Sequence, residues 1–293
     1  MRFSNTDCPS SARPAAFPPT AADTVAPVRA IDGRPEAGVL LLCDHASNAL
    51  PPAYGRLGLP DAQFDRHIAY DIGAATATQA MAEALGAPAL MTTFSRLLID
   101  PNRGADDPTL VMRLSDGAIV PGNARVGSDE IERRRRRFWQ PYHDAIEARL
   151  TAMLATGIVP AVVSVHSFTP MWKDVPRPWH VGLLWDNDAR LAAPLLAALG
   201  REPDLQPADE KVGDNEPYDG ALPGDTMDSH ATRHGLANVL IEVRQDLMAS
   251  ERAARAWGLR LARLLGPVLE RPEVHAIEIH PPRTGARRRL DAL

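Results

Sequence analysis

The chain contains few cysteines and few aromatic residues. Only two of its 293 residues are cysteine, Cys8 and Cys43. A framework of disulfide bonds is therefore not expected, and this cysteine usage fits the reducing cytoplasm. Aromatic residues make up 5% of the chain, which disfavours a surface that stacks the bases of single-stranded nucleic acid.

Long apolar runs and a strong net charge are also absent. No apolar run approaches the roughly 18–20 residues of a membrane span, and no apolar core accompanies Arg2 as a secretory signal would require. The formal net charge of -5 opposes binding to nucleic acid or anionic lipid. Arginines 133–137 would point in all directions on a helix, which indicates a solvated face. We therefore expect neither nucleic acid nor a membrane as a partner, and the oligomeric state stays open.

The sequence does contain an ordered middle between two segments of unusual composition. Residues 1–35 are rich in Pro, Ala, Ser and Thr without a hydrophobic period, and predict a flexible N-terminal tail. Residues 273–293 are basic and predict a loose C-terminal tail. A single domain is predicted between them, over residues 36–272.

Apolar segments of strand length alternate with segments of helical period across this domain. Helices are predicted at about 71–85, 128–155 and 250–269, the second with a hydroxyl cap from Ser128. The alternation predicts an α/β fold of three layers, with a mostly parallel or mixed sheet flanked by helices. Strands are predicted at residues 39–43, 89–94, 160–165, 181–185 and 238–244, and the continuous apolar run 39–43 is typical of a strand buried on both faces.

Four of these strands lead into ionisable side chains. Because sites of α/β sheets lie at the carboxyl ends of the strands, we expect His45, Arg96, His166 and Glu242 to share one rim. One histidine after a strand is more often a turn cap than a metal ligand. Two strands that both lead into histidine favour a shared metal ion.

The third metal ligand is not fixed by the sequence. Zinc hydrolases usually have three protein ligands and an open position for water. The HxxE spacing of many zinc peptidases is missing, because Asn48 stands where the glutamate would be, and an amide is a poor zinc ligand. Asp71 and Asp44 are the carboxylate candidates, with Asp71 preferred, although Asp71 could equally cap a helix.

Three further polar residues have both a functional and a structural interpretation. Glu242 lies in an apolar strand, so it is either a general base or an ion-pair partner of Arg244. Arg96 and Arg103 bracket a short apolar segment, and arginine forms two parallel hydrogen bonds with a carboxylate. The alternative for these arginines is a surface ion pair with Asp100 or Asp106.

Several segments are similar, in their order along the chain, to motifs of the N-formylglutamate amidohydrolase family. The similarity extends over about residues 38–270, and the ordered set is specific although each motif is short. The motifs are His45 after the first strand, Tyr70-Asp71-Ile72-Gly73-Ala74, Ser95-Arg96, Asp100-Pro101-Asn102-Arg103, Pro141-Tyr142-His143, His166-Ser167-Phe168, Asn215-Glu216-Pro217-Tyr218 and Ile241-Glu242-Val243-Arg244-Gln245-Asp246-Leu247.

The resemblance implies a fold shared with zinc carboxypeptidases and aspartoacylase-like enzymes. It implies a zinc ion held by His45 and His166, with Asp71 the preferred third ligand, and a reaction that hydrolyses N-formyl-L-glutamate to formate and glutamate, as in histidine degradation. Glu242 would be the catalytic carboxylate and Arg96 would stabilise the oxyanion. The substrate, a small acidic amide, would be bound by Asn102, Arg103, Tyr218 and Arg244.

Two other functions remain open on the residues alone. A deacylase of other N-acyl amino acids, or a carboxypeptidase-like hydrolase, would use the same side chains around a pocket of different size. A non-catalytic binder of metal or carboxylate would need the histidines and arginines but not Glu242.

Overall fold

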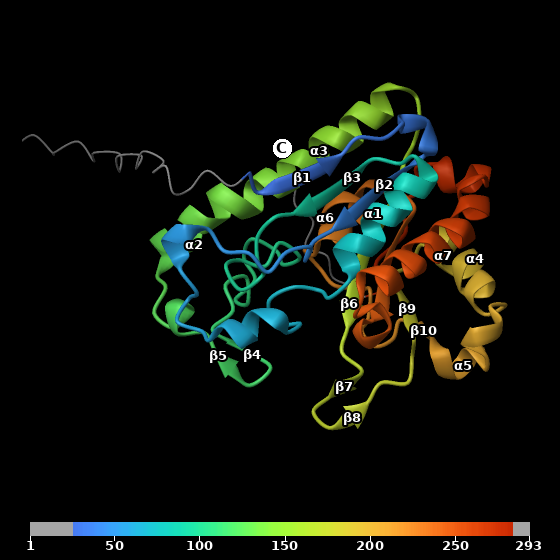
Figure 1. Cartoon of the computed structure of the whole chain (residues 1–293). Coiled ribbons are helices and arrows are strands. Elements are labelled where there is room, and N and C mark those ends of the chain that lie inside the picture. Colours follow the sequence, from blue (N-terminus) through green and yellow to red (C-terminus); the bar gives the residue numbers. More distant parts are fainter. Residues whose placement is uncertain (1–25, 284–293) are drawn as a thin grey trace, which may run out of the picture.

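The computed structural model describes residues 26–283, which form a mixed seven-stranded sheet between two layers of helices (Figure 1). The strand order is β1-β3-β2-β6-β11-β9-β10. The four central strands β3, β2, β6 and β11 are parallel, while β1, β9 and β10 run the opposite way. The strands are β1 (Val28–Ile31), β2 (Val39–Cys43), β3 (Ala89–Thr92), β6 (Ala161–Phe168), β9 (Val181–Leu184), β10 (Val212–Asp214) and β11 (Asn238–Arg244).

Each face of the sheet is covered by helices that bury one set of the alternating strand side chains. Helices α1 (Ala74–Leu85), α4 (Ala189–Leu199) and α7 (Glu251–Leu269) cover one face. Helices α3 (Gln140–Ala155) and α6 (Thr226–His230) cover the other. Odd-numbered residues of β2, such as Leu41, pack under the first group, and even-numbered ones under the second. The predicted three-layer α/β fold is thus confirmed.

The predicted tails are too long at both ends. Strand β1 lies inside the segment predicted as a flexible tail, and pairs antiparallel with β3 at the sheet edge. Its residues are half-buried or exposed, so the strand lacks the continuous apolar run by which a buried strand is recognised in the sequence. After α7, Val274 is fully buried and His275 bonds to the carbonyls of Val159 and Leu269. The parts of the predicted tails at 1–25 and 284–293 lie outside the described residues.

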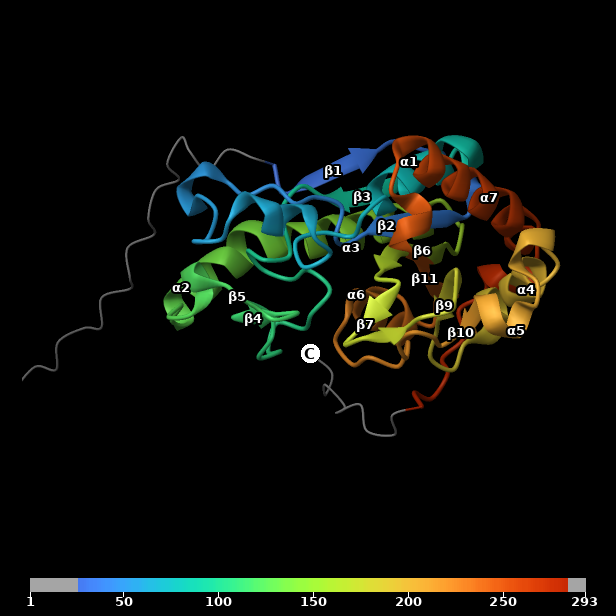
Figure 2. The same ribbon diagram turned by 60° about the horizontal axis from the view of Figure 1, so that its bottom comes forward.

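The predicted helix over 128–155 is one long helical element that is interrupted near its middle by a π-helical segment (Figure 2). Helix α2 (Ser128–Arg134) passes through a π-helical turn (Arg135–Trp139) into α3. Two details of the prediction are wrong. Gly127 occupies the N-cap and no side chain caps the helix. Arg134 is buried rather than solvated, because it donates to the Leu98 carbonyl and the Asn123 side chain.

Two short hairpins and a small helix complete the described part of the chain. The β7–β8 hairpin (Met171–Trp172 and Val175–Pro176) projects beyond the end of β6 (Figure 1). The second hairpin joins β4 (Leu114–Ser115) to β5 (Ala118–Ile119), and α5 (Ala208–Lys211) precedes β10. None of the described helices combines the length and apolar character needed to cross a membrane.

Candidate metal centre

Three buried side chains from separate segments meet at the carboxyl end of the central strands. His45 lies just after β2, His166 lies within β6, and Asp71 precedes α1. The main-chain N–H of Asp71 donates to the His45 carbonyl at 3.0 Å, which ties this loop to the end of β2. One ligand atom from each of the three residues lies within 4.8 Å of the other two. The expected rim of the sheet therefore exists, although His166 belongs to the strand rather than following it.

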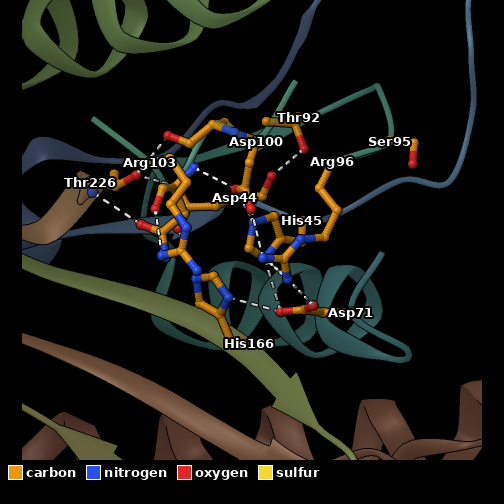
Figure 3. Close-up of polar contacts among 12 residues, drawn as sticks. Asp44, His45, Asp71, Thr92, Ser95, Arg96, Asp100, Arg103, His166 and Thr226 are labelled. Carbon is orange, nitrogen blue, oxygen red and sulfur yellow. Dashed lines mark hydrogen bonds and ion pairs between the residues drawn. The ribbon is translucent and has the colours of Figure 1, made fainter. Parts of the chain in front are cut away.

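Both histidines turn the same ring nitrogen towards Asp71 (Figure 3). Nδ1 of His166 lies 2.8 Å from Oδ2 of Asp71, and Nδ1 of His45 lies 3.3 Å from the same oxygen. Two imidazole nitrogens and one carboxylate oxygen form a donor set typical of catalytic zinc sites, which have three protein ligands. The His45–Asp71–His166 group could therefore hold a metal ion.

Two further carboxylates, those of Asp100 and Asp44, contact the other ring nitrogen of His45 and His166. Nε2 of His45 lies 2.7 Å from Oδ1 of Asp100, and Nε2 of His166 lies 2.8 Å from Oδ2 of Asp44. Such outer carboxylates orient the rings of metal-binding histidines and raise their basicity. The two candidates for the third ligand therefore contact opposite nitrogens of the His166 ring. Asp71 contacts Nδ1, and Asp44 contacts Nε2.

Asp44 is the centre of a fully satisfied buried network. Its oxygens accept hydrogen bonds from Tyr142, Ser164 and Thr226 in addition to the contact with His166. Burial alone would raise the pKa of this carboxyl, but the hydrogen bond and charge of His166 hold it well below its usual value. The network thus keeps Asp44 ionised and leaves it no free oxygen for another role.

Glu242 lies on β11 directly opposite His166 on β6. It is 6% exposed, and its Oε2 is buried without a hydrogen-bond partner in the described part of the chain. Burial and the charge of Asp71 raise its pKa to about 7, against the opposing charges of His166, His45 and Arg96. The alternative ion pair with Arg244 is not formed, because Arg244 pairs with Asp246. An unpartnered carboxylate beside the ligands is a candidate proton acceptor.

Arg96 contacts His45 and the two carboxylates beside it, and its Nη1 lies 3.3 Å from Nδ1 of His45. Its Nη2 pairs with Oδ2 of Asp100 at 2.6 Å, and Nη1 lies 3.7 Å from Oδ1 of Asp71. The ion pair with Asp100 that the sequence allowed is present but buried. Nε of Arg96 has no partner among the described residues, so this edge can still donate to a ligand.

Asn102 and Arg103 follow Asp100 in the loop beside Arg96. The Asn102 side-chain oxygen accepts from the Thr226 N–H at 3.0 Å, at the start of α6. Arg103 is anchored by its main chain, because its carbonyl accepts a hydrogen bond from Trp139. Its guanidinium forms no ion pair within the described part of the chain. Against the effect of burial, the charges of Arg96 and Arg103 lower the pKa of Asp100, so the loop presents a cation close to the carboxylate that contacts His45. The side-chain oxygen of Asn102 serves the fold.

A pair of stacked histidines supports this loop from behind. His143 Nε2 donates to the Pro101 carbonyl at 3.0 Å, and its Nδ1 accepts from His230 Nε2 at 2.7 Å. Burial lowers the pKa of His143 to about 4 and that of His230 to about 3. Both rings are therefore neutral near pH 7, which makes this donor-to-acceptor chain self-consistent.

The sequence indicated the ligands but missed the residues that hold them. Asp100 was considered only as a surface partner of an arginine, and the network around Asp44 was not expected at all. The signal in the sequence was the apolar segment 97–99 directly before Asp100, which pointed to the burial that the structure shows for this residue. A further missed residue is Arg177, which follows β8 and donates to the Tyr218 hydroxyl at 3.0 Å.

Comparisons with known proteins show the family and the fold of the chain. A family model described as N-formylglutamate amidohydrolase matches residues 37–249. The crystal structure of a gene product from Agrobacterium tumefaciens is similar at a TM-score of 0.78 and 33% sequence identity, covering 87% of this chain and 98% of that one. N-formylglutamate amidohydrolase from Ralstonia eutropha JMP134 shares the fold at a TM-score of 0.54 and 22% identity, with 82% and 99% covered.

No curated protein sequence matches the chain. The family model nevertheless spans 213 of the 293 residues, which include every residue of the metal group and Glu242. The chain belongs to the N-formylglutamate amidohydrolase family.

Proposed function

We propose that the protein is a zinc-dependent hydrolase that converts N-formyl-L-glutamate, or a similar N-acyl amino acid, to the free acid and the amino acid. The family is one of amide hydrolases. The observation that carries the proposal is the His45–Asp71–His166 group with Glu242 on the neighbouring strand. A metal-binding protein without catalysis has no need for a buried carboxylate oxygen that is left unpartnered, because burying such an atom costs stability.

The ligands fit zinc, and the chemistry follows from what lies around them. Bound zinc would polarise the amide carbonyl and lower the pKa of water towards about 7. Glu242, whose pKa is raised to about 7, accepts a proton from the attacking water. It then donates this proton to the leaving nitrogen as the C–N bond breaks, so the formyl group leaves as formate. The Nε edge of Arg96 faces the charge that develops on the carbonyl oxygen.

Substrate orientation is assigned to the loop after Pro101. Arg103 has no ion pair with a described carboxylate, and the Asn102 amide group lies next to it. A substrate carboxylate bound there would place the scissile amide near the metal group, and positioning of this kind contributes a large share of the rate. Burial and the charge of Glu242 raise the pKa of the Tyr218 hydroxyl, so this hydroxyl lies near the general base and is assigned to substrate binding.

Two measurements on the purified protein test the proposal. Metal analysis is expected to find one zinc ion per chain, and incubation with N-formyl-L-glutamate is expected to release formate. A panel of N-acetyl and longer N-acyl amino acids separates the formyl hydrolase from the other deacylases. Stoichiometric metal without hydrolysis of any substrate in the panel would favour the non-catalytic binder. The cytoplasmic location and the link with histidine degradation stay predictions from the sequence.

A further inference from the structure

Arg177 is a buried arginine without a carboxylate partner among the described residues. Its exposed fraction is only 8%. Its two side-chain hydrogen bonds both come from Nη1, at 3.2 Å to the Thr169 hydroxyl and 3.0 Å to the Tyr218 hydroxyl. A buried cation is costly unless it is paired, so an anion is expected to bind here. The Nε and Nη2 edge, which forms no bond to any described residue, is the edge that takes a carboxylate in two parallel hydrogen bonds.

Aromatic rings surround the guanidinium of Arg177. Its central carbon lies 4.8 Å from the ring centre of Tyr218, 5.4 Å from that of Trp172 and 5.9 Å from that of Phe168. Such rings stabilise the cation by their π faces and restrict its orientation. Trp172 belongs to the β7–β8 hairpin, and its ring also lies 6.4 Å from that of His67. The guanidinium of Arg177 is thus held in one orientation by its neighbours, unlike that of a solvated surface arginine.

The main chain places Arg177 next to the proposed reaction centre. Its N–H donates to the Pro170 carbonyl, and its own carbonyl accepts from Arg244. Thr169 follows His166 by three residues, and Arg244 follows Glu242 by two, on neighbouring parallel strands. Arg177 is therefore bound to residues that follow His166 and Glu242 closely in the sequence, Thr169 after β6 and Arg244 at the end of β11. Arg244, predicted to bind substrate, positions Arg177 instead.

We propose that Arg177, together with the Tyr218 hydroxyl, binds the side-chain carboxylate of the substrate and so selects acidic N-acyl amino acids. The inference rests on the proposed hydrolase function. An acyl-glutamate carries two carboxylates, and the site offers two guanidinium groups without ion pairs to described residues, those of Arg103 and Arg177. Arg103 in the loop after Pro101 takes the carboxylate nearest the amide, and Arg177 takes the distal one.

The test compares two substrates of nearly equal shape on variants of the full chain. N-formyl-L-glutamine keeps the carboxylate nearest the amide and replaces the distal one by an amide. Arg177→Met is expected to lower kcat/KM for N-formyl-L-glutamate by about 10–100-fold, mainly through KM, the loss typical of one charged hydrogen-bond pair. For N-formyl-L-glutamine the change should stay within about threefold, and metal content should be unchanged. Lys173→Met, which removes an exposed charge from the same hairpin, is the control and should leave the preference intact.

Binding without turnover provides a second readout. Calorimetry should show that glutarate binds the wild-type protein more tightly than butyrate, and that Arg177→Met abolishes this difference. If Arg177→Met does not fold, Arg177→Lys and Tyr218→Phe are compared in the same way, and each should reduce the preference. Equal losses on both substrates, or an unchanged preference, would overturn the role of Arg177. Failure of the wild-type protein to hydrolyse any formyl amino acid while still preferring glutarate would instead refute the proposed reaction.

Discussion

Glu242 is the residue whose environment is hardest to explain without catalysis. Replacing it by glutamine keeps the shape of the side chain and removes the proton acceptor. We expect kcat to fall by about 10²–10⁴ while zinc is retained. Steady-state kinetics with metal analysis measure both quantities. Glu147→Gln, on the exposed face of α3, is the matched control, and near-normal turnover in Glu242→Gln would leave Glu242 without the assigned role.

The two carboxylates around His166 are expected to respond differently to substitution. Asp71→Ala removes a ligand, so zinc should no longer bind stoichiometrically, as in His45→Ala or His166→Ala. Asp44→Asn removes an orienting partner, and zinc affinity should fall only about 10–100-fold. Competition with a chelator measures the affinities. The reverse order would make Asp44 the ligand and Asp71 the orienting residue.

Arg103 is expected to show its role through a conservative change. Arg103→Lys keeps the charge but cannot form two parallel hydrogen bonds. The loss should be about 1.5–3 kcal/mol, or one to two decades in kcat/KM for N-formyl-L-glutamate. A formyl amide without the neighbouring carboxylate should be hydrolysed poorly and equally by both proteins. If the variant slows both substrates alike, Arg103 acts on the reaction or the fold rather than on substrate choice.

The sequence predicted the residues that follow strands and missed those that depend on distant loops. His45, His166 and Glu242 could be found because each lies at or near the end of an apolar run, and the parallel sheet gathers such ends. The sequence favoured Asp71 over Asp44 as the third ligand without a geometric reason, because the contacts of the two carboxylates with His166 appear only in the fold. Arg177 was missed since its position depends on a hairpin and on Tyr218, 41 residues away.

At the level of elements, the closest helix contact joins α1 to α7. A Cβ atom on Gly258 would lie 2.3 Å from the Ala77 carbonyl oxygen, so alanine cannot fit without moving a helix. Gly258→Ala is expected to lower the free energy of unfolding by about 1–3 kcal/mol, although alanine favours helix by about 1 kcal/mol. Gly266→Ala, in the same helix with nothing within 4 Å, keeps this gain in helix propensity and should raise the free energy of unfolding by up to about 1 kcal/mol. The midpoints of denaturant unfolding measure these changes. A midpoint of Gly258→Ala equal to that of the wild-type protein would refute the tight contact.

Strand β1, at the edge of the sheet, shows which kind of strand could not be predicted from this sequence. The central strands were found because both faces are buried and their side chains are mostly apolar. Strand β1 (Val28–Ile31) has two exposed residues between two half-buried ones, and its pairing with β3 is fixed by main-chain hydrogen bonds. Hydropathy does not record such bonds, so the domain boundary was placed after the strand.

For the whole molecule, the metal group links three separate parts of the chain. Its ligands come from the end of β2, the loop before α1, and β6. A ligand bound only by the folded state stabilises it, by about 2.7 kcal/mol at a free concentration 100 times the dissociation constant. We expect chelation to lower Tm, and added zinc to restore it. A metal-dependent rise in Tm that is as large in His166→Ala as in the wild-type protein would place the ion elsewhere.

The stability of the whole molecule should also depend on the neutral pair His143–His230. Burial holds the pKa of His230 at about 3 in the folded protein, against about 6.5 in an unfolded chain. Between these values the unfolded state binds more protons, so this contribution is complete above pH 6.5 and is lost as the pH falls. Asp225 and Glu242, whose pKa values are raised to about 7 by burial, act in the opposite direction.

A difference measurement isolates the histidine from these opposing groups. His230→Gln keeps a donor for His143 Nδ1 and removes the titrating ring, while the remaining groups are common to both proteins and cancel. We expect the wild-type free energy of unfolding, minus that of the variant, to fall between pH 6.5 and 4 by up to about 1.4 kcal/mol per pH unit. The measurement uses urea unfolding of chelated protein, because metal release is itself promoted by acid. A pH-independent difference would mean that the pKa of His230 is the same in the folded and unfolded states, and that the buried pair does not control acid stability.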